Sequence, residues 1–107
     1  MLKLVERFRV RGDSMLPTLS DGVVVTALRV PSVFLRAGMV VVAEVEPDVH
    51  VVKRIAAKTS RNTVSLSSDN DTTTSVYCGV DIKTQRVSGV VIHATRPRVQ
   101  ASPNSAT

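Results

Sequence analysis

Residues 39–57 read MVVVAEVEPDVHVVKRIAA, and this stretch decides the fold class. Residues 39–45 form an apolar run whose length and composition are typical of a strand buried on both faces. Glu46-Pro47-Asp48 has the chemistry of a tight turn, and residues 50–57 form a second strand-like run. The stretch therefore predicts a β-hairpin with antiparallel strands.

Further strands are predicted on both sides of this hairpin, at residues 4–11, 23–27, 63–67 and 85–95, with turn residues between them. About a third of the chain is Val, Thr or Ile, which suit strands better than helices. No long amphipathic helix is indicated. We therefore predict an all-β fold of small barrel-like or coiled antiparallel sheets, with one domain over residues 1–96 and a small, polar, disordered tail over residues 97–107.

Composition argues against several classes of function. No run approaches the roughly 18 apolar residues of a membrane span, and the first residues lack the apolar stretch of a signal peptide. A single cysteine, Cys78, fits a reducing cytoplasm. The net charge of +5 comes with only three aromatic residues and with Lys and Arg scattered singly, which does not favour nucleic-acid binding. His50, Cys78 and His93 lack the short spacings of metal ligands, so neither a metal nor a cofactor is expected.

One serine and one lysine stand in positions suited to chemistry. Ser14 follows Gly12-Asp13 at a junction between a strand and a turn. A serine nucleophile needs a base nearby, and a lysine can be that base only when its amine is neutral, which burial favours. Period-two alternation places Lys53 on one strand face with Val51 and Ile55, an apolar setting. The alternative is that Lys53 lies on an edge strand and extends its stem to water.

Five motifs in order resemble a known superfamily. Gly12-Asp13-Ser14-Met15, the glycine turn and strand at 36–41, and Val52-Lys53-Arg54-Ile55 are similar to segments of type I signal peptidases and of LexA- and UmuD-like self-cleaving proteins. Ser68-Asp69-Asn70 and the closing strand at 87–91 continue the match, which covers roughly residues 8–95. The resemblance implies a serine-lysine peptidase domain with the fold of the signal peptidase and LexA C-terminal domains.

The resemblance also implies a role for individual residues. Ser14 would be the nucleophile, Lys53 the general base, and the backbone amides of Asp13 and Ser14 the oxyanion hole. Gly12 stands where signal peptidases carry a second hydroxyl, and Gly12 and Met15 would support or wall the site. Thr74 would replace the serine that contacts the lysine, although the loop after Asn70 departs from the signal peptidase pattern.

The expected substrate is another protein or peptide. Ser14 and Lys53 are too close in the sequence to admit the large inserted domain of many signal peptidases, and the 13 residues before Ser14 hold no Ala-Gly or Cys-Gly pair for self-cleavage. In size and layout the chain resembles the maturation proteases that remove the leader of nickel-type superoxide dismutase precursors. Self-processing of the LexA or UmuD kind, a catalytically silent binding module on the same fold and a basic nucleic-acid-associated domain stay open as alternatives.

Overall fold

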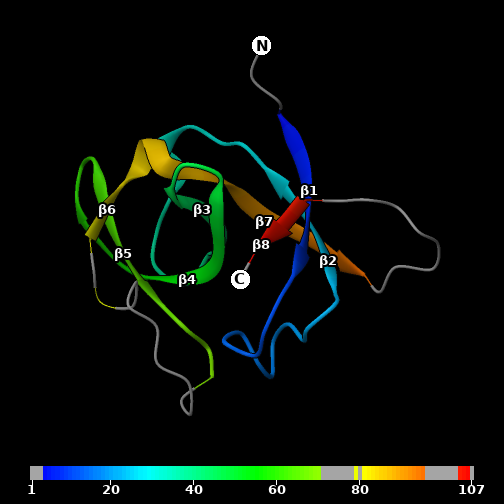
Figure 1. Ribbon diagram of the computed structural model, residues 1–107. Helices are drawn as coiled ribbons and strands as arrows, with labels where there is room; N and C mark the ends of the chain where they lie inside the picture. Colours follow the sequence, from blue (N-terminus) through cyan, green and yellow to red (C-terminus); the bar gives the residue numbers. More distant parts are fainter. Residues whose placement is uncertain (1–3, 71–78, 80, 96–103, 107) are drawn as a thin grey trace.

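The computed structural model describes residues 4–70, 79, 81–95 and 104–106, and the regular secondary structure of this part is almost entirely β-strand. The strands and the two short 3-10 helices are β1 (Val5–Val10), β2 (Val24–Leu28), η1 (Ser32–Phe34), β3 (Val40–Glu46), β4 (Val49–Ser60), β5 (Thr63–Ser67), β6 (Asp81–Lys83), η2 (Thr84–Arg86), β7 (Val87–Thr95) and β8 (Asn104–Ala106). Figure 1 shows their arrangement. The described strands form one sheet in the order β6-β5-β4-β3-β7-β2-β1-β8. The predicted all-β class is confirmed.

The sheet is antiparallel except at one end, and it coils on itself. β8 pairs in parallel with β1 and also contacts β4, which lies five strands away in the sheet order. This contact brings the β8 end of the sheet back toward β4, while β8 lies against β1 (Figure 1). The predicted barrel-like or coiled arrangement of antiparallel strands is therefore confirmed.

The β3–β4 hairpin separates two buried clusters. Val42 pairs with Val52, and both belong to a cluster that also contains Phe8 and Met15. Their strand neighbours point to the other face and join a second cluster, which contains Val41, Ala43, Val51, Ile55, Val64 and Leu66. The hairpin is thus buried on both faces, as the apolar run at 39–45 predicts.

Gly89 lets β7 lie close to β2 in the middle of the sheet. A Cβ atom at this position would meet the Ala27 Cβ at 2.9 Å and the backbone of Leu28 at 3.0 Å. The β2–β7 register also shifts between Thr26 and Ala27, beside this contact. A side chain at position 89 would therefore push apart two strands that hold the core together.

Several features of the strands differ from the prediction. β6 is an additional strand, and the predicted strand at 85–95 begins only at Val87, because Thr84–Arg86 forms η2. β4 extends to Ser60, beyond the predicted end at residue 57, because it pairs with β5 through two register shifts. Residues 104–106, predicted to belong to a disordered tail, form β8 and place Ala106 in the first buried cluster. The rest of the predicted tail, apart from these three residues, lies outside the described part. Within that part, no helix is long and apolar enough to cross a bilayer.

Candidate active site

Ser14 lies in a compact turn directly after β1. Gly12 begins the turn with a φ of +87°, a conformation that residues with a side chain rarely adopt, and its N–H donates to the Asp21 carboxylate at 2.7 Å. Backbone bonds from Leu16 to Asp13 and from Leu19 to Met15 tighten the segment that follows. Met15 is fully buried and anchors the turn in the core, which leaves Ser14 half-buried at its surface.

Lys53 is buried in the centre of β4. Its residue is 3% exposed, and it lies directly opposite Val41 of β3, on the face of the second buried cluster. This burial excludes the alternative in which the lysine stem extends to water. The Lys53 Nζ donates a hydrogen bond to the Ser68 Oγ at 3.0 Å.

Ser68 contacts Lys53 because the two residues lie opposite each other when the β4–β5 pairing is continued by one residue. Ile55 pairs with Leu66 and Arg54 with Ser67, so the next step of the same register brings Lys53 opposite Ser68. Opposite residues of an antiparallel pair project from the same face. Thr74, the hydroxyl predicted to contact the lysine, lies outside the described residues.

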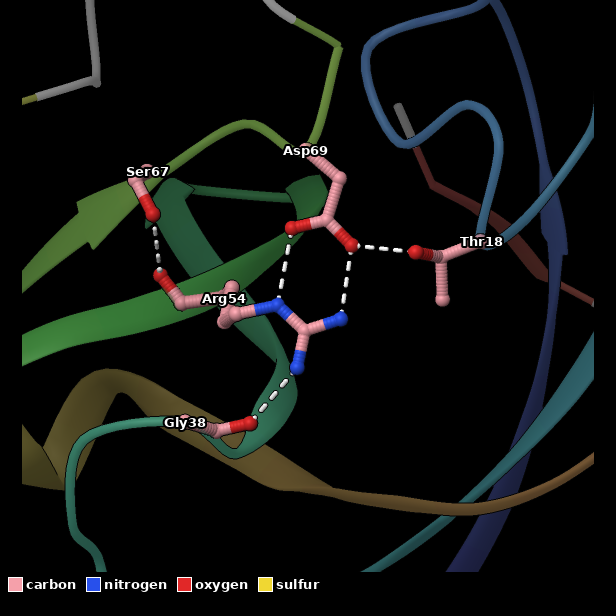
Figure 2. Close-up of polar contacts among 5 residues, drawn as sticks. All are labelled: Thr18, Gly38, Arg54, Ser67 and Asp69. Carbon is pink, nitrogen blue, oxygen red and sulfur yellow. Dashed lines mark hydrogen bonds and ion pairs between the residues drawn. The ribbon is translucent and has the colours of Figure 1, made fainter.

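Asp69 joins three separate segments (Figure 2). The Arg54 guanidinium donates from Nε to Asp69 Oδ1 at 2.8 Å and from Nη2 to Oδ2 at 2.6 Å, a bidentate ion pair. Thr18, four residues after Ser14, donates its hydroxyl to Asp69 Oδ2 at 2.5 Å. The Arg54 Nη1 reaches the Gly38 carbonyl at 2.7 Å. Asp69 therefore links the lysine strand to the segment that follows the serine.

The ion pair shifts the pKa values of both Asp69 and Arg54. The hydrogen bond from Arg54 lowers the pKa of Asp69 below its ordinary value, with a further contribution from Thr18 and against the opposing effect of desolvation. The same hydrogen bond raises the pKa of Arg54. Asp69 is thus held as a carboxylate throughout the neutral range.

Asn70 donates two hydrogen bonds to the backbone of the turn that carries Ser14. Its backbone N–H donates to the Ser14 carbonyl at 2.9 Å, and its side-chain Nδ2 donates to the Asp13 carbonyl at 2.8 Å. Both of these bonds end on carbonyl oxygens of the serine turn. We call residues 68–70 the bridge, because Ser68 contacts Lys53, Asp69 contacts Arg54 and Thr18, and Asn70 contacts the Ser14 turn.

A coiled all-β domain with a serine turn and a buried strand lysine has the arrangement that the sequence motifs predict, that of the signal peptidase and LexA-like class. The chain matches the family model described as Peptidase S24-like over residues 6–92. It therefore belongs to the Peptidase S24-like family, and the predicted kinship with LexA- and UmuD-like serine peptidases is confirmed. No curated protein and no solved structure matches the chain. Family membership supports a serine peptidase or LexA-like role.

Sequence reasoning identified the bridge as a motif but did not assign its contacts. In the sequence Ser68, Asp69 and Asn70 are indicated only by the resemblance, and no pattern indicates a contact of Thr18. The pattern that could have indicated Ser68 is the strand pairing of Lys53, which depends on the exact register of β4 and β5.

Proposed function

We propose that this protein is a serine endopeptidase that processes another polypeptide, with Ser14 as nucleophile and Lys53 as general base. The observation that supports this proposal best is the buried Lys53, whose amine is held by the same three-residue bridge that holds the backbone at Ser14. A buried ammonium is costly in an apolar setting, so such a lysine is suited to work as a neutral amine.

In the proposed mechanism the neutral amine of Lys53 takes the proton of the Ser14 hydroxyl as its oxygen attacks the scissile carbonyl. The backbone amides of Asp13 and Ser14 stabilise the oxyanion. Lys53 then delivers the proton to the leaving amine, and water, activated by the same lysine, hydrolyses the acyl-enzyme. Ser68 orients the amine, while Gly12 and Met15 shape and support the turn.

The finer proposal concerns the substrate. We propose that the substrate is a precursor whose leader is removed, with a nickel-type superoxide dismutase precursor as the specific candidate. The layout of the motifs supports this choice, because the short stretch between Ser14 and Lys53 has no room for the large inserted domain of many signal peptidases.

Cleavage of such a precursor tests the proposal. The wild type is compared with Ser14→Ala and with Lys53→Met, which keeps an apolar stem of similar length, and mass spectrometry locates the cut. The matched controls are Ser20→Ala, in the same loop, and Lys58→Ala, on the same strand. We expect a loss of about 10³-fold or more in both dyad variants and little change in the controls. Cleavage at the wild-type rate by either dyad variant would exclude that residue from the chemistry.

A further inference from the structure

Strand β8 occupies the edge of β1 that faces away from β2. It pairs in parallel with the second half of β1, with Phe8 opposite residue 104 and Val10 opposite Ala106. The Arg11 N–H donates to the Ala106 carbonyl at 2.7 Å. Because the strands are parallel, β8 runs along β1 toward the turn that carries Ser14. Figure 1 shows this short red strand lying against β1.

The end of β8 packs against residues close to the candidate active site. Ala106 is 1% exposed and belongs to the same buried cluster as Val10 and Met15, the residue after Ser14. β8 also contacts β4, the strand of Lys53. An extended three-residue segment therefore lies against both the strand that leads to the serine and the strand that carries the lysine.

A sheet edge accepts an extended polypeptide through backbone hydrogen bonds, and this edge directs its occupant toward Ser14. We propose, building on the peptidase function above, that β8 is a built-in occupant of the substrate edge and acts as an autoinhibitory strand. A substrate polypeptide pairs with the same edge of β1, and β8 leaves before it does so. β8 pairs with only three of the six residues of β1, so a longer extended substrate gains backbone pairing that β8 does not make.

A reversible lock tests the proposal by comparing two forms of one protein that carry the same substitutions. Arg9 and residue 105 are direct partners across the parallel pair, and neighbouring strands lie close enough for a disulfide. The double variant Arg9→Cys/Ser105→Cys is made in the full chain together with Cys78→Ser. We expect the oxidised form to cleave the precursor at least 10-fold more slowly than its reduced form. Equal rates in the two forms would overturn the proposal.

An opened variant tests binding without catalysis. Ala106→Asp places a charge at a buried position, and Ala57→Asp makes the same change at an exposed position of β4. Both variants also carry Ser14→Ala. The probe is a fluorescent peptide of residues 101–107, ASPNSAT, and we expect it to bind the Ala106→Asp protein at least 10-fold more tightly than the Ala57→Asp protein. Equal affinity would contradict the proposal.

Hydrogen exchange reports whether the opened variant stays folded. The Val10 amide, which donates to the carbonyl of Val23 just before β2, should stay protected, while the Arg11 amide, which donates to the Ala106 carbonyl, should lose protection. If both amides lose protection, the Ala106→Asp variant is unfolded, and the comparison of the oxidised and reduced disulfide variant tests the proposal instead. Selective peptide binding by the Ala106→Asp protein, with no cleavage of the precursor by the wild type, would count against the peptidase function and keep β8 as an occupant of this edge. Full cleavage by the locked form would refute the role of β8 and keep the peptidase.

Discussion

Replacing Asp69 by Asn tests whether the bridge holds the two halves of the site together. Asn removes the negative charge while it keeps the size of the side chain and one acceptor oxygen. The wild-type carboxylate is 13% exposed and accepts two bonds from Arg54 and one from Thr18. We therefore expect Asp69→Asn to lower the free energy of unfolding at pH 7.

The size of this loss follows from the environment of the pair. Hydrogen bonds to charged groups contribute about 1.5–3 kcal/mol, whereas exposed ion pairs contribute about 0–1 kcal/mol. The Arg54 side chain is 33% exposed, which screens the pair in part. We expect a loss of about 2 kcal/mol, or roughly 8 °C in Tm for a domain of this size.

The pH dependence of stability distinguishes the charge contribution of the Asp69–Arg54 ion pair from the contribution of side-chain packing. The folded pKa of Asp69 lies below its ordinary value of 3.8, so the unfolded chain takes up the proton first as the pH falls. The stabilisation by the Asp69 carboxylate is complete at pH values above the ordinary pKa of Asp69. It disappears as the pH falls through the pKa that Asp69 has in the folded protein. The gap in stability between wild type and Asp69→Asn should therefore stay constant from pH 8 to about 5 and shrink below about pH 4.

Thermal unfolding followed by circular dichroism, from pH 7 down to pH 3, measures this gap. Asp81→Asn, at an exposed position of β6, is the matched control and should change Tm little at any pH. A double-mutant cycle with Arg54→Met should give a coupling energy of about 1 kcal/mol or more. An unchanged Tm for Asp69→Asn at pH 7, or a gap as large at pH 3 as at pH 7, would refute the reasoning.

Three further predictions concern single contacts. Ser68→Ala should lower kcat about 10-fold with little change in KM, because it removes a partner of the Lys53 amine, and Ser68→Thr should restore part of the rate. Asn70→Ala should lower the free energy of unfolding in urea by about 1 kcal/mol, because the Asp13 carbonyl loses its side-chain donor; an equal stability would contradict this. Gly89→Ala should cost about 1–3 kcal/mol in the same assay, since its Cβ would lie 2.9 Å from that of Ala27, whereas Ser88→Ala should cost much less.

The burial of Lys53 could be predicted from the sequence. Alternation along a strand has a period of two whatever the turns do, so a lysine between Val51 and Ile55 shares their face. The structure places all three in or beside the second buried cluster. The same reasoning predicted the β3–β4 hairpin and the turn at Gly12, because local patterns of apolar and turn residues are sufficient for both.

The partner of Lys53 could not be predicted in this way. The β4–β5 hairpin begins with Ser60 opposite Thr63, and an unbroken register from there would bring Lys53 opposite Asn70. Two register shifts along β4 move the pairing by one residue each, so that Ser68 faces the lysine instead. Such irregularities depend on how the strands pack and leave no mark in hydrophobic periodicity.

By itself, the sequence determined the fold class, the strand-to-turn position of Ser14 and the buried face of Lys53, because each depends on local periodicity and turn chemistry. Tertiary structure alone decided that three consecutive residues bridge the serine turn and the lysine strand, and that Ala106 lies beside β1. These contacts join segments distant in the chain, and their geometry is set by register shifts and by the coiling of the sheet. A short polar segment such as residues 104–106 becomes a strand because the edge of β1 and the buried cluster beside it accept it.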